Sequence, residues 1–228
     1  MNNSAIRVMN DYVDFTKTRP DGIYLWIDKK NIFQQYALII GPANTPYFGG
    51  YFFFDIVYPA DYPKNPPTVN LLTINNKVRF NPNLYESGKV CLSILGTWAG
   101  PSWKPIMNIR LVLNSIMSLM GEYPIQNEPG FENTKPEHIS SIEYNLSLIY
   151  HTYDLAICDV LSGKFNFISK YFQKEISDEF NANKKKLEED LLSYQQIYGK
   201  VPVDKQIYFM KKEMLDFNAL VGKFNGIK

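Results

Sequence analysis

The sequence predicts an α+β fold in which helices gather beside one antiparallel sheet. Four short apolar runs between residues 23 and 73 are joined by connections too short to hold a crossover helix. Apolar residues at helical spacing precede these runs and return after residue 106. The chain has 228 residues, of which 45% are hydrophobic, so it can bury a substantial core.

The first predicted element is an amphipathic helix. Ser4 is its candidate N-cap, and Pro20 with Gly22 ends it. Helical spacing assigns its apolar stripe to Ile6, Met9 and Val13, with Val8 and Tyr12 beside them.

Four strands are predicted next. Residues 23–27, 33–40 and 51–57 are rich in β-branched and aromatic side chains, and a fourth run, 68–73, follows the proline-rich segment YPADYPKNPP. Turn residues separate the first three runs at 28–31 and 41–50. An antiparallel meander is the most economical arrangement of such strands.

Two helices are predicted after the sheet, and with them a first domain over residues 1–163. The helix over 106–120 stops at Gly121 and shares one apolar face among Ile109, Val112, Leu113, Ile116 and Met120. The longer helix ends near Gly163 and repeats its apolar residues in steps of four and three, at Ile142, Leu146, Ile149, Tyr153, Ala156 and Val160.

Residues 164–228 are predicted to form a helical extension. Two apolar stripes are expected on its helices, one of Leu187, Leu191, Tyr194 and Tyr198, the other of Ile207, Met210, Met214, Phe217, Val221 and Phe224. Such stripes could form a dimer seam or a partner-binding surface, but packing on their own domain is the favoured interpretation. The balanced charge block at 184–190 indicates a solvated helix face with local ion pairs.

Charge and composition argue against several function classes. The net charge is +1, from 24 basic and 23 acidic residues, so neither nucleic acid nor an anionic membrane is an expected partner. The sequence has no apolar run of the roughly 18 residues that a membrane span needs, and its start does not resemble a signal peptide. Two cysteines and two histidines are too few for a disulfide framework or a structural zinc site. We therefore expect a soluble protein of a reducing compartment, cytoplasmic or nuclear, with no bound metal.

The most informative segment is the aperiodic one from Arg79 to Pro105, because long ordered loops inside domains usually carry function. Taken alone, Cys91 in this segment is more often a small core residue than a nucleophile. A cysteine phosphatase would need arginine where Thr97 stands, and no histidine lies in a cysteine-protease motif.

The surrounding motifs change this interpretation. The segment YPADYPKNPPTV, then Asn81-Pro82-Asn83, then Cys91 eight residues later, followed by LSIL and a Trp-x-Pro, resembles the catalytic domain of ubiquitin-conjugating enzymes. The insertion GTWAGPS at 96–102 and the segment 118–132 are similar to one branch of that family. That branch contains a large enzyme for ubiquitin and FAT-type modifiers and the conjugating domain of a giant inhibitor-of-apoptosis protein.

The resemblance implies that Cys91 accepts ubiquitin, or a ubiquitin-like modifier, as a thioester from an activating enzyme and passes it to a lysine of a protein substrate. A free thiol is a few per cent thiolate at neutral pH, which suffices for exchange between thioesters without a dedicated base. Asn83 matches an asparagine that acts as an oxyanion donor or a brace for the loop, and a donor of that kind is worth roughly 3 to 4 kcal/mol. An ordinary Asx turn around Pro82 is the structural alternative, and both roles can coexist.

Further positions of the active-site loop follow from the same resemblance: Asn81, Tyr85, Ser93, Trp98, Asn127 and Glu128. Asn81 replaces the usual histidine of the family and is interpreted as a structural substitute. Asn127 or Glu128 would face the incoming lysine, with a solvated loop charge as the favoured alternative for Glu128. Ser93 replaces a common acidic neighbour, and Trp98 either walls the cysteine or anchors the insertion.

Ligase contacts are implied at Trp103 and Pro105, which match the loop that touches RING or HECT ligases. Lys64 stands where many members of the family carry an exposed phenylalanine, so a binding hot spot is expected to be missing. Cys158 is interpreted as a packing residue of its helix.

The resulting prediction is an active conjugating enzyme with no bound cofactor, since ATP and magnesium are used upstream by the activating enzyme. Two alternatives remain at this stage. One is a non-catalytic variant of the fold that only presents ubiquitin, against which Cys91 argues. The other is a modifier-binding scaffold whose work is done by the extension.

Overall fold

Helix α1 (Asn3–Lys17) leads into a four-stranded antiparallel sheet in the computed structural model, which describes residues 3–204 and 207–227. The strands β1 (Ile23–Ile27), β2 (Gln34–Ile40), β3 (Tyr51–Val57) and β4 (Thr68–Leu71) pair in sequence order. This meander with flanking helices confirms the predicted α+β fold class.

The buried face of α1 differs from the predicted stripe. Ala5, Val8 and Phe15 are buried, whereas Ile6 and Val13 are 45% and 40% exposed. The large Phe15 side chain lies in the main core and sets the rotation of the helix. Ser4 lies inside the first turn of α1, so the prediction that it is the N-cap was wrong.

The centre of the sheet is covered on both faces. Phe52, Phe53 and Phe54 are successive residues of β3 that point to alternate faces, and all three are fully buried. The predicted fourth strand is shorter than expected because the Thr73 hydroxyl takes over the pairing. It accepts from the Phe53 amide at 2.9 Å and donates to the Tyr51 carbonyl at 3.0 Å.

The two predicted domain helices are present with different ends. Helix α2 (Ile109–Leu119) buries the predicted face, but it begins three residues late because the Asn108 side chain caps it by accepting from the Leu111 amide at 3.1 Å. Helix α3 (Ile139–His151) continues into a π-helical segment, η3 (Thr152–Asp159), which the sequence did not indicate. The segment buries consecutive side chains from Leu155 to Cys158, so it is surrounded by packed residues.

The C-terminal extension contains a strand pair as well as helices. Its elements are α4 (Asn166–Ser169), α5 (Gln173–Tyr198), the hairpin of β5 (Lys200–Val203) and β6 (Glu213–Asp216), and α6 (Phe217–Asn225). The second predicted helical stripe was therefore wrong before Phe217. Met214 lies on β6 and is 52% exposed, and the Asp216 side chain caps α6 by accepting from the Ala219 amide at 3.0 Å.

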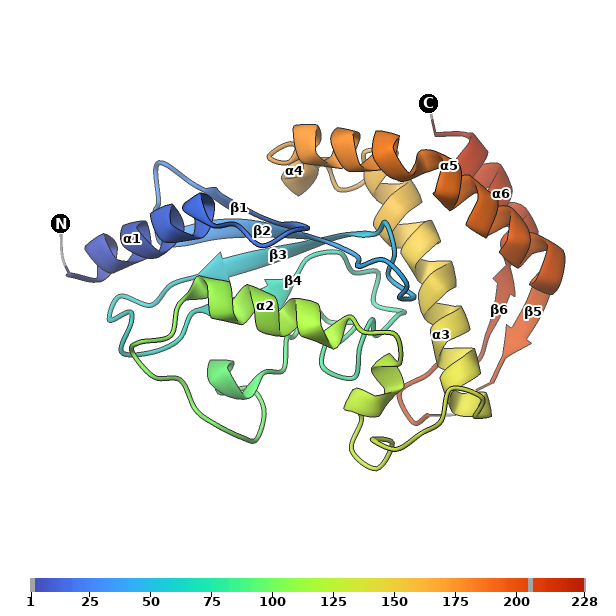
Figure 1. The fold of residues 1–228 in the computed structure, drawn as a ribbon, viewed down its shortest axis with the longest axis horizontal. Helices are drawn as coiled ribbons and strands as arrows, with labels where there is room; N and C mark the ends of the chain where they lie inside the picture. Colours follow the sequence, from blue (N-terminus) through green and yellow to red (C-terminus); the bar gives the residue numbers. More distant parts are fainter. Residues whose placement is uncertain (1–2, 205–206, 228) are drawn as a thin grey trace.

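The extension packs on the domain through two regions. The main core includes apolar side chains from two parts of the extension: the region of α4 and α5, and the segment that begins at residue 207. They are Phe165, Ile168, Phe172, Ile176, Ile207 and Met210. A second core lies between η3, α5, the hairpin and α6, with Cys158, Leu187, Leu191, Leu215 and Phe217 at its centre. In Figure 1, α3 crosses the end of the sheet remote from the N-terminus, and α5, α6 and the hairpin form the layer beyond it.

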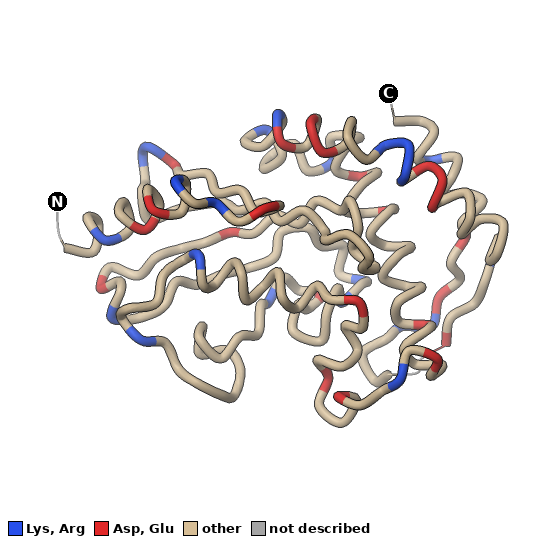
Figure 2. The backbone as a smooth tube through the Cα atoms, in the orientation of Figure 1, with Lys and Arg blue, Asp and Glu red and all other residues tan. Residues whose placement is uncertain are grey.

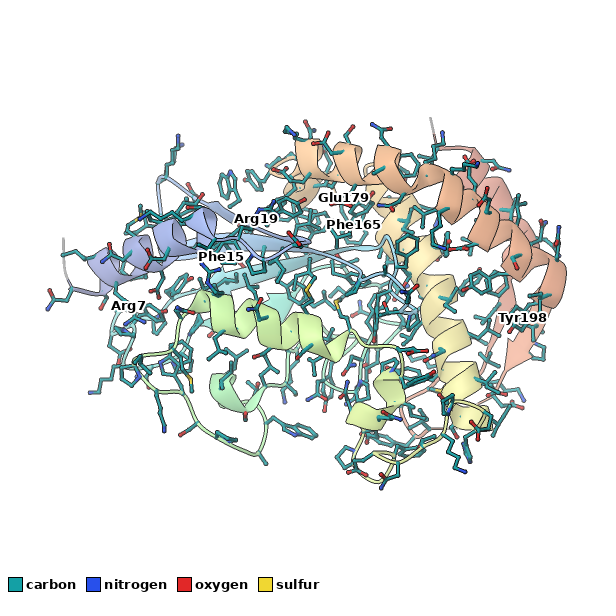
Figure 3. All side chains as sticks on the ribbon, in the orientation of Figure 1. Arg7, Phe15, Arg19, Phe165, Glu179 and Tyr198 are labelled. Atoms are coloured by element: carbon teal, nitrogen blue, oxygen red, sulfur yellow. The ribbon has the colours of Figure 1, made fainter. Side chains whose placement is uncertain are left out.

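Aromatic and polar contacts also connect the extension to the first strands. Tyr171 stacks on Trp26 with a ring-centroid distance of 3.9 Å. The Tyr24 hydroxyl donates to Glu179 of α5 at 3.3 Å, and Arg19 lies 4.1 Å above the Tyr24 ring. Figure 3 shows Arg19 and Glu179 on the same side of the sheet, near the start of α5.

The charge block on α5 forms the predicted local pairs. Lys186 lies 3.2 Å from Asp190, and Lys185 lies 3.8 Å from Glu189, both at a spacing of four residues. Figure 2 shows basic and acidic segments next to each other along this helix. Within the described residues, no helix is both long enough and apolar enough to cross a bilayer.

Candidate active site

Cys91 lies in the loop that connects β4 to α2, and its side chain is buried, with 1% of the residue exposed. Two hydrogen bonds join it to Asn83. The Cys91 amide donates to the Asn83 carbonyl at 2.8 Å, and the Asn83 side-chain amide donates to the Cys91 carbonyl at 2.9 Å. The reciprocal pair fixes the backbone on which the thiol stands. We call residues 79–97 the active-site loop.

Asn81 serves as the structural link that the sequence suggested. Its carbonyl oxygen Oδ1 accepts from the Asn83 amide at 2.9 Å, which closes an Asx turn around Pro82. Its Nδ2 donates to the Leu119 carbonyl at the end of α2, at 2.7 Å. Because Asn81 is fully buried and uses both ends of its amide, it holds the loop to the helix.

Asn83 uses one of its two side-chain N–H groups in the bond to the Cys91 carbonyl. In this arrangement the residue braces the loop. The side-chain amide has a second N–H, so the turn, the brace and a donor for the oxyanion of a thioester carbonyl are compatible roles for one side chain.

Thr97 is a residue that sequence reasoning did not assign to the site. Its hydroxyl accepts from the Leu92 amide at 2.9 Å and donates to the Val90 carbonyl at 2.8 Å. These bonds bracket Cys91 on both sides along the chain. A lone threonine in an aperiodic loop gives no sequence signal for such a role, because the contact depends on how the loop folds.

The insertion folds back over the residues that follow Cys91. Ser93 begins the short helix η1 (Ser93–Leu95), and a Cβ atom at Gly100 would come within 2.9 Å of the Ser93 Cβ. Only glycine permits this close approach, and Gly100 also has a φ of 135°. Trp98 of the insertion is 40% exposed.

Tyr85 interacts with the Cys91 side chain, and Arg79 packs on Tyr85. The Arg79 guanidinium lies 3.6 Å above the Tyr85 ring. Burial raises the pKa of the Tyr85 hydroxyl, the positive charge of Arg79 acts in the opposite direction, and interaction with the Cys91 side chain adds to the rise. Tyr85 thus stays a neutral phenol beside the sulfur.

Asn127 is the last residue of η2 (Pro124–Asn127), and Glu128 is its C-cap. The Asn127 side chain donates to the Leu119 carbonyl at 3.3 Å, the same acceptor that Asn81 uses. Glu128 is only 6% exposed, so its interpretation as a solvated loop charge was wrong. The residue is turned inward, and its negative charge helps to raise the pKa of the buried Tyr144.

The predicted ligase contacts form an adjoining surface. The Trp103 indole N–H donates to the Pro63 carbonyl at 2.7 Å, which brings the loop of Trp103 next to that of Lys64. Lys64 and Pro105 are exposed, and Ile106 is 85% exposed. We call segments 62–64 and 103–106 the docking loops. Arg7 of α1, labelled in Figure 3, donates to the Pro105 carbonyl at 2.9 Å and so ties these loops to the first helix.

The second cysteine and the two histidines have structural roles in other parts of the fold. Burial raises the pKa of the Cys158 thiol to about 12, and His138 caps α3. His151 faces Glu213 of the hairpin, with Nε2 3.0 Å from a carboxylate oxygen. Across residues 3–204 and 207–227, no three His, Cys, Asp or Glu side chains gather in a way that could hold a metal ion.

Comparisons with known proteins agree with this geometry. The model of the family "Ubiquitin-conjugating enzyme" matches residues 7–141. Ubiquitin-conjugating enzyme E2 Z of Xenopus tropicalis is 46% identical over 164 residues, which are 72% of this chain and 52% of that protein. Human BIRC6, a dual E2 ubiquitin-conjugating enzyme/E3 ubiquitin-protein ligase, is 47% identical over 141 residues, 58% of this chain and 3% of that protein.

Among solved structures, the E2 domain of a Toxoplasma gondii ubiquitin-conjugating enzyme superposes with a TM-score of 0.53 at 29% identity. The match covers 66% of this chain and 97% of that one. The chain spans about half the length, or less, of the curated relatives named above. The family match and these relatives confirm the resemblance and its branch: the chain belongs to the ubiquitin-conjugating enzyme family.

Proposed function

We propose that Cys91 carries ubiquitin, or a ubiquitin-like modifier, as a thioester and transfers it to lysine on a protein substrate. The observation that carries this proposal is the reciprocal pair of hydrogen bonds between Cys91 and Asn83. It fixes the backbone of the cysteine that lies in the aperiodic loop, and it holds the Asn83 side-chain amide at the carbonyl of that cysteine. The other cysteine lies deep in a helical core.

Charging is a thioester exchange. The Cys91 sulfur, as thiolate, attacks the carbonyl carbon of the modifier's C-terminus on an activating enzyme, and the thiol of that enzyme leaves as the new S–C bond forms. The two thioesters have similar energies, so no dedicated base is needed. Because Cys91 is 1% exposed, the residues over the sulfur, Tyr85 among them, must move aside when the modifier arrives.

Discharge is the harder step. A neutral lysine amine attacks the thioester carbonyl and an oxyanion forms. The C–S bond then breaks as the amide C–N bond is completed, Cys91 leaves as the thiolate, and the proton lost by the amine passes to that thiolate or to water. The free N–H of Asn83 is the donor for the oxyanion. The resemblance assigns Asn127 or Glu128 to the approach of the lysine, but Glu128 is 6% exposed, so we assign it a supporting role and not that of a base in direct contact with solvent.

The partners follow from the same chemistry. An activating enzyme supplies the thioester and consumes ATP and magnesium upstream, so this chain needs no bound cofactor. The docking loops are the contact surface for a RING or HECT ligase. The reaction requires a free thiol, so we place it in the reducing cytoplasm or nucleus.

The test is a charging assay. The protein is mixed with ATP, magnesium, ubiquitin and each of several activating enzymes, and the products are separated without reductant. We expect an adduct that thiol reductants release. Cys91→Ser should give at most a reductant-resistant oxyester, and Cys158→Ala should still charge. An adduct that survives Cys91→Ala but disappears with Cys158→Ala would overturn the proposal.

A further inference from the structure

Arg79 is an unusual buried cation at the start of the active-site loop. It is 7% exposed, and it forms no ion pair with a carboxylate in the described part of the chain. Its guanidinium instead donates to the Pro82 carbonyl, from Nε at 3.1 Å and also from one terminal nitrogen. That carbonyl immediately precedes Asn83. Arg79 therefore holds the turn from which the brace of Cys91 starts.

Two aromatic rings from distant parts of the chain flank this guanidinium. Tyr85 of the active-site loop lies 3.6 Å away, and Phe209 of the C-terminal extension lies 4.4 Å away. Tyr208 is farther, at 6.0 Å, and 65% exposed. A planar, weakly hydrated guanidinium is suited to such stacking on aromatic faces, and here the rings take the place of a counter-ion.

Phe209 is firmly anchored for a residue in a connection between strands. Its ring meets Tyr144 edge to face at 5.6 Å, and the Tyr144 hydroxyl donates to the Arg79 carbonyl at 2.8 Å. Met210, next along the chain, is buried in the main core. Lys211 donates to the Asn76 carbonyl at 2.8 Å. The extension thus presents Phe209 from a fixed backbone.

We propose that Phe209 is a positioning residue for the reactive thiol. It holds Arg79 against Tyr85 and the Pro82 carbonyl, and thereby keeps Asn83 in its turn and Tyr85 in its place on the active-site loop. Phe209 lies outside residues 7–141, which match the family model, so the extension would supply part of the active-site support. For its effect on transfer, the proposal rests on the proposed function, but its effect on the thiol can be measured without any modifier.

The experiment measures the rate at which iodoacetamide alkylates Cys91 in the full chain, with peptide mass spectrometry to separate Cys91 from Cys158. The variants are Phe209→Leu, which keeps apolar bulk but removes the ring, and Phe209→Tyr, which keeps the ring. Tyr208→Leu is the matched control, because it removes a neighbouring ring that is exposed and farther from Arg79.

Loss of one cation–π contact of ordinary strength corresponds to about a two- to fivefold change in an equilibrium. We therefore expect Phe209→Leu to raise the alkylation rate of Cys91 by about threefold, because Arg79 then holds Tyr85 and the turn before Asn83 less firmly and the enclosed thiol becomes accessible more often. Phe209→Tyr and Tyr208→Leu should stay near the wild-type rate. Arg79→Lys should resemble Phe209→Leu, and the double variant should not be additive, since both changes break one chain of contacts.

An unchanged Cys91 rate in Phe209→Leu would overturn the proposal. An equal rise at Cys91 and Cys158 would also overturn it, because it would reveal general loosening of the protein. In charging assays we expect Phe209→Leu to slow discharge onto free lysine while charging proceeds normally. If the wild type forms no thioester with any activating enzyme, the proposed function fails, yet the alkylation rates still decide whether Phe209 positions the thiol.

Discussion

The active-site loop and the docking loops are held by similar hydrogen bonds, but the first encloses its central residue and the second presents side chains to solvent. In both, side chains hold backbone carbonyls: Asn83 holds that of Cys91, and Trp103 holds that of Pro63. The first arrangement encloses a residue that is 1% exposed, whereas the second presents Ile106 at 85% exposure. Chemistry at a thiol needs a fixed and shielded backbone, while recognition by a partner needs fixed but accessible side chains. Mutations in the two regions should therefore affect different steps.

The largest effect is expected at Asn83. Asn83→Ala removes the brace and the amide donor, and we predict that it slows discharge onto free lysine by more than about tenfold while charging stays largely intact. Single-turnover discharge of purified thioester measures this. Asn81→His is the control, because an imidazole also offers one acceptor and one donor, and it should change the rate little. Equal loss of charging and discharge in Asn83→Ala would mean that the residue only maintains the fold.

A second prediction concerns the anchor of the extension, the pair of His151 and Glu213. Burial acts to raise the pKa of Glu213, but the interactions with His151, Ser147 and Lys77 together outweigh it, so the pKa lies below its ordinary value. A lowered carboxyl pKa stabilises the folded state above the unfolded pKa of about 4.3, and this contribution is lost as the pH falls through the folded value.

We expect Glu213→Gln to lower the free energy of unfolding by about 1 kcal/mol at pH 7, since hydrogen bonds to a charged carboxylate are replaced by weaker ones to a neutral amide. The difference from wild type should shrink as the pH is lowered below about 4. Urea unfolding at several pH values measures it. Glu189→Gln, at an exposed pair on α5, should show almost no effect at any pH. A difference that grows toward acid would contradict the assignment.

Elements that depend on the pattern within their own segment could be predicted from the sequence, whereas features that depend on packing between segments could not. The strands and the buried face of α2 follow from apolar spacing within each segment, and the structure has them in place. The face of α1 does not, because two stripes compete and the packing of Phe15 decides between them. The C-terminal stripe failed for a related reason: helical spacing continued by chance across β6, where pairing with β5 fixes an extended backbone.

The candidate site likewise has residues that a local motif identifies and residues that only tertiary contacts reveal. Cys91 and the asparagines are identified by motifs, which are local patterns in the sequence. Thr97, Arg79 and Phe209 act through contacts with backbone carbonyls and rings that only the folded loops bring together. No periodicity or spacing marks such contacts. Residues that position a site from a distance are therefore the part that sequence reasoning misses.

A smaller effect is expected at Thr97. Thr97→Val keeps the shape of the side chain but removes both hydrogen bonds beside Cys91, and since the residue is exposed, water replaces part of them. We predict a loss of about 1 kcal/mol in the free energy of unfolding. Discharge should also slow, because the loop has lost one of its fixed points. Thr97→Ser retains the hydroxyl and should behave as wild type; if it is as impaired as Thr97→Val, the methyl group and not the hydrogen bonds would be responsible.

The smallest effect is predicted at Lys64, in the docking loops. An exposed aromatic anchor that enters a pocket of a partner commonly contributes about 2 kcal/mol or more, roughly thirtyfold in affinity, and lysine cannot fill such a pocket. The native chain should therefore respond weakly to generic RING ligases and transfer appreciably without them. Lys64→Phe restores an aromatic ring at an exposed position, but the neighbouring surface has not been fitted to it, so we expect only about a threefold stronger RING response.

Charging should be unaffected by this change, because Lys64 lies on the docking loops and the Cys91 thiol is enclosed by the active-site loop. The measurement compares discharge onto lysine with and without a RING domain for both forms. Lys104→Phe provides a control on the second docking loop, since it adds the same ring at another exposed position. If the native protein is already strongly stimulated, and Lys64→Phe adds nothing, then the Trp103 loop and the exposed Ile106 are sufficient for docking. Fixed geometry would then matter as much in the exposed region as it does around Cys91.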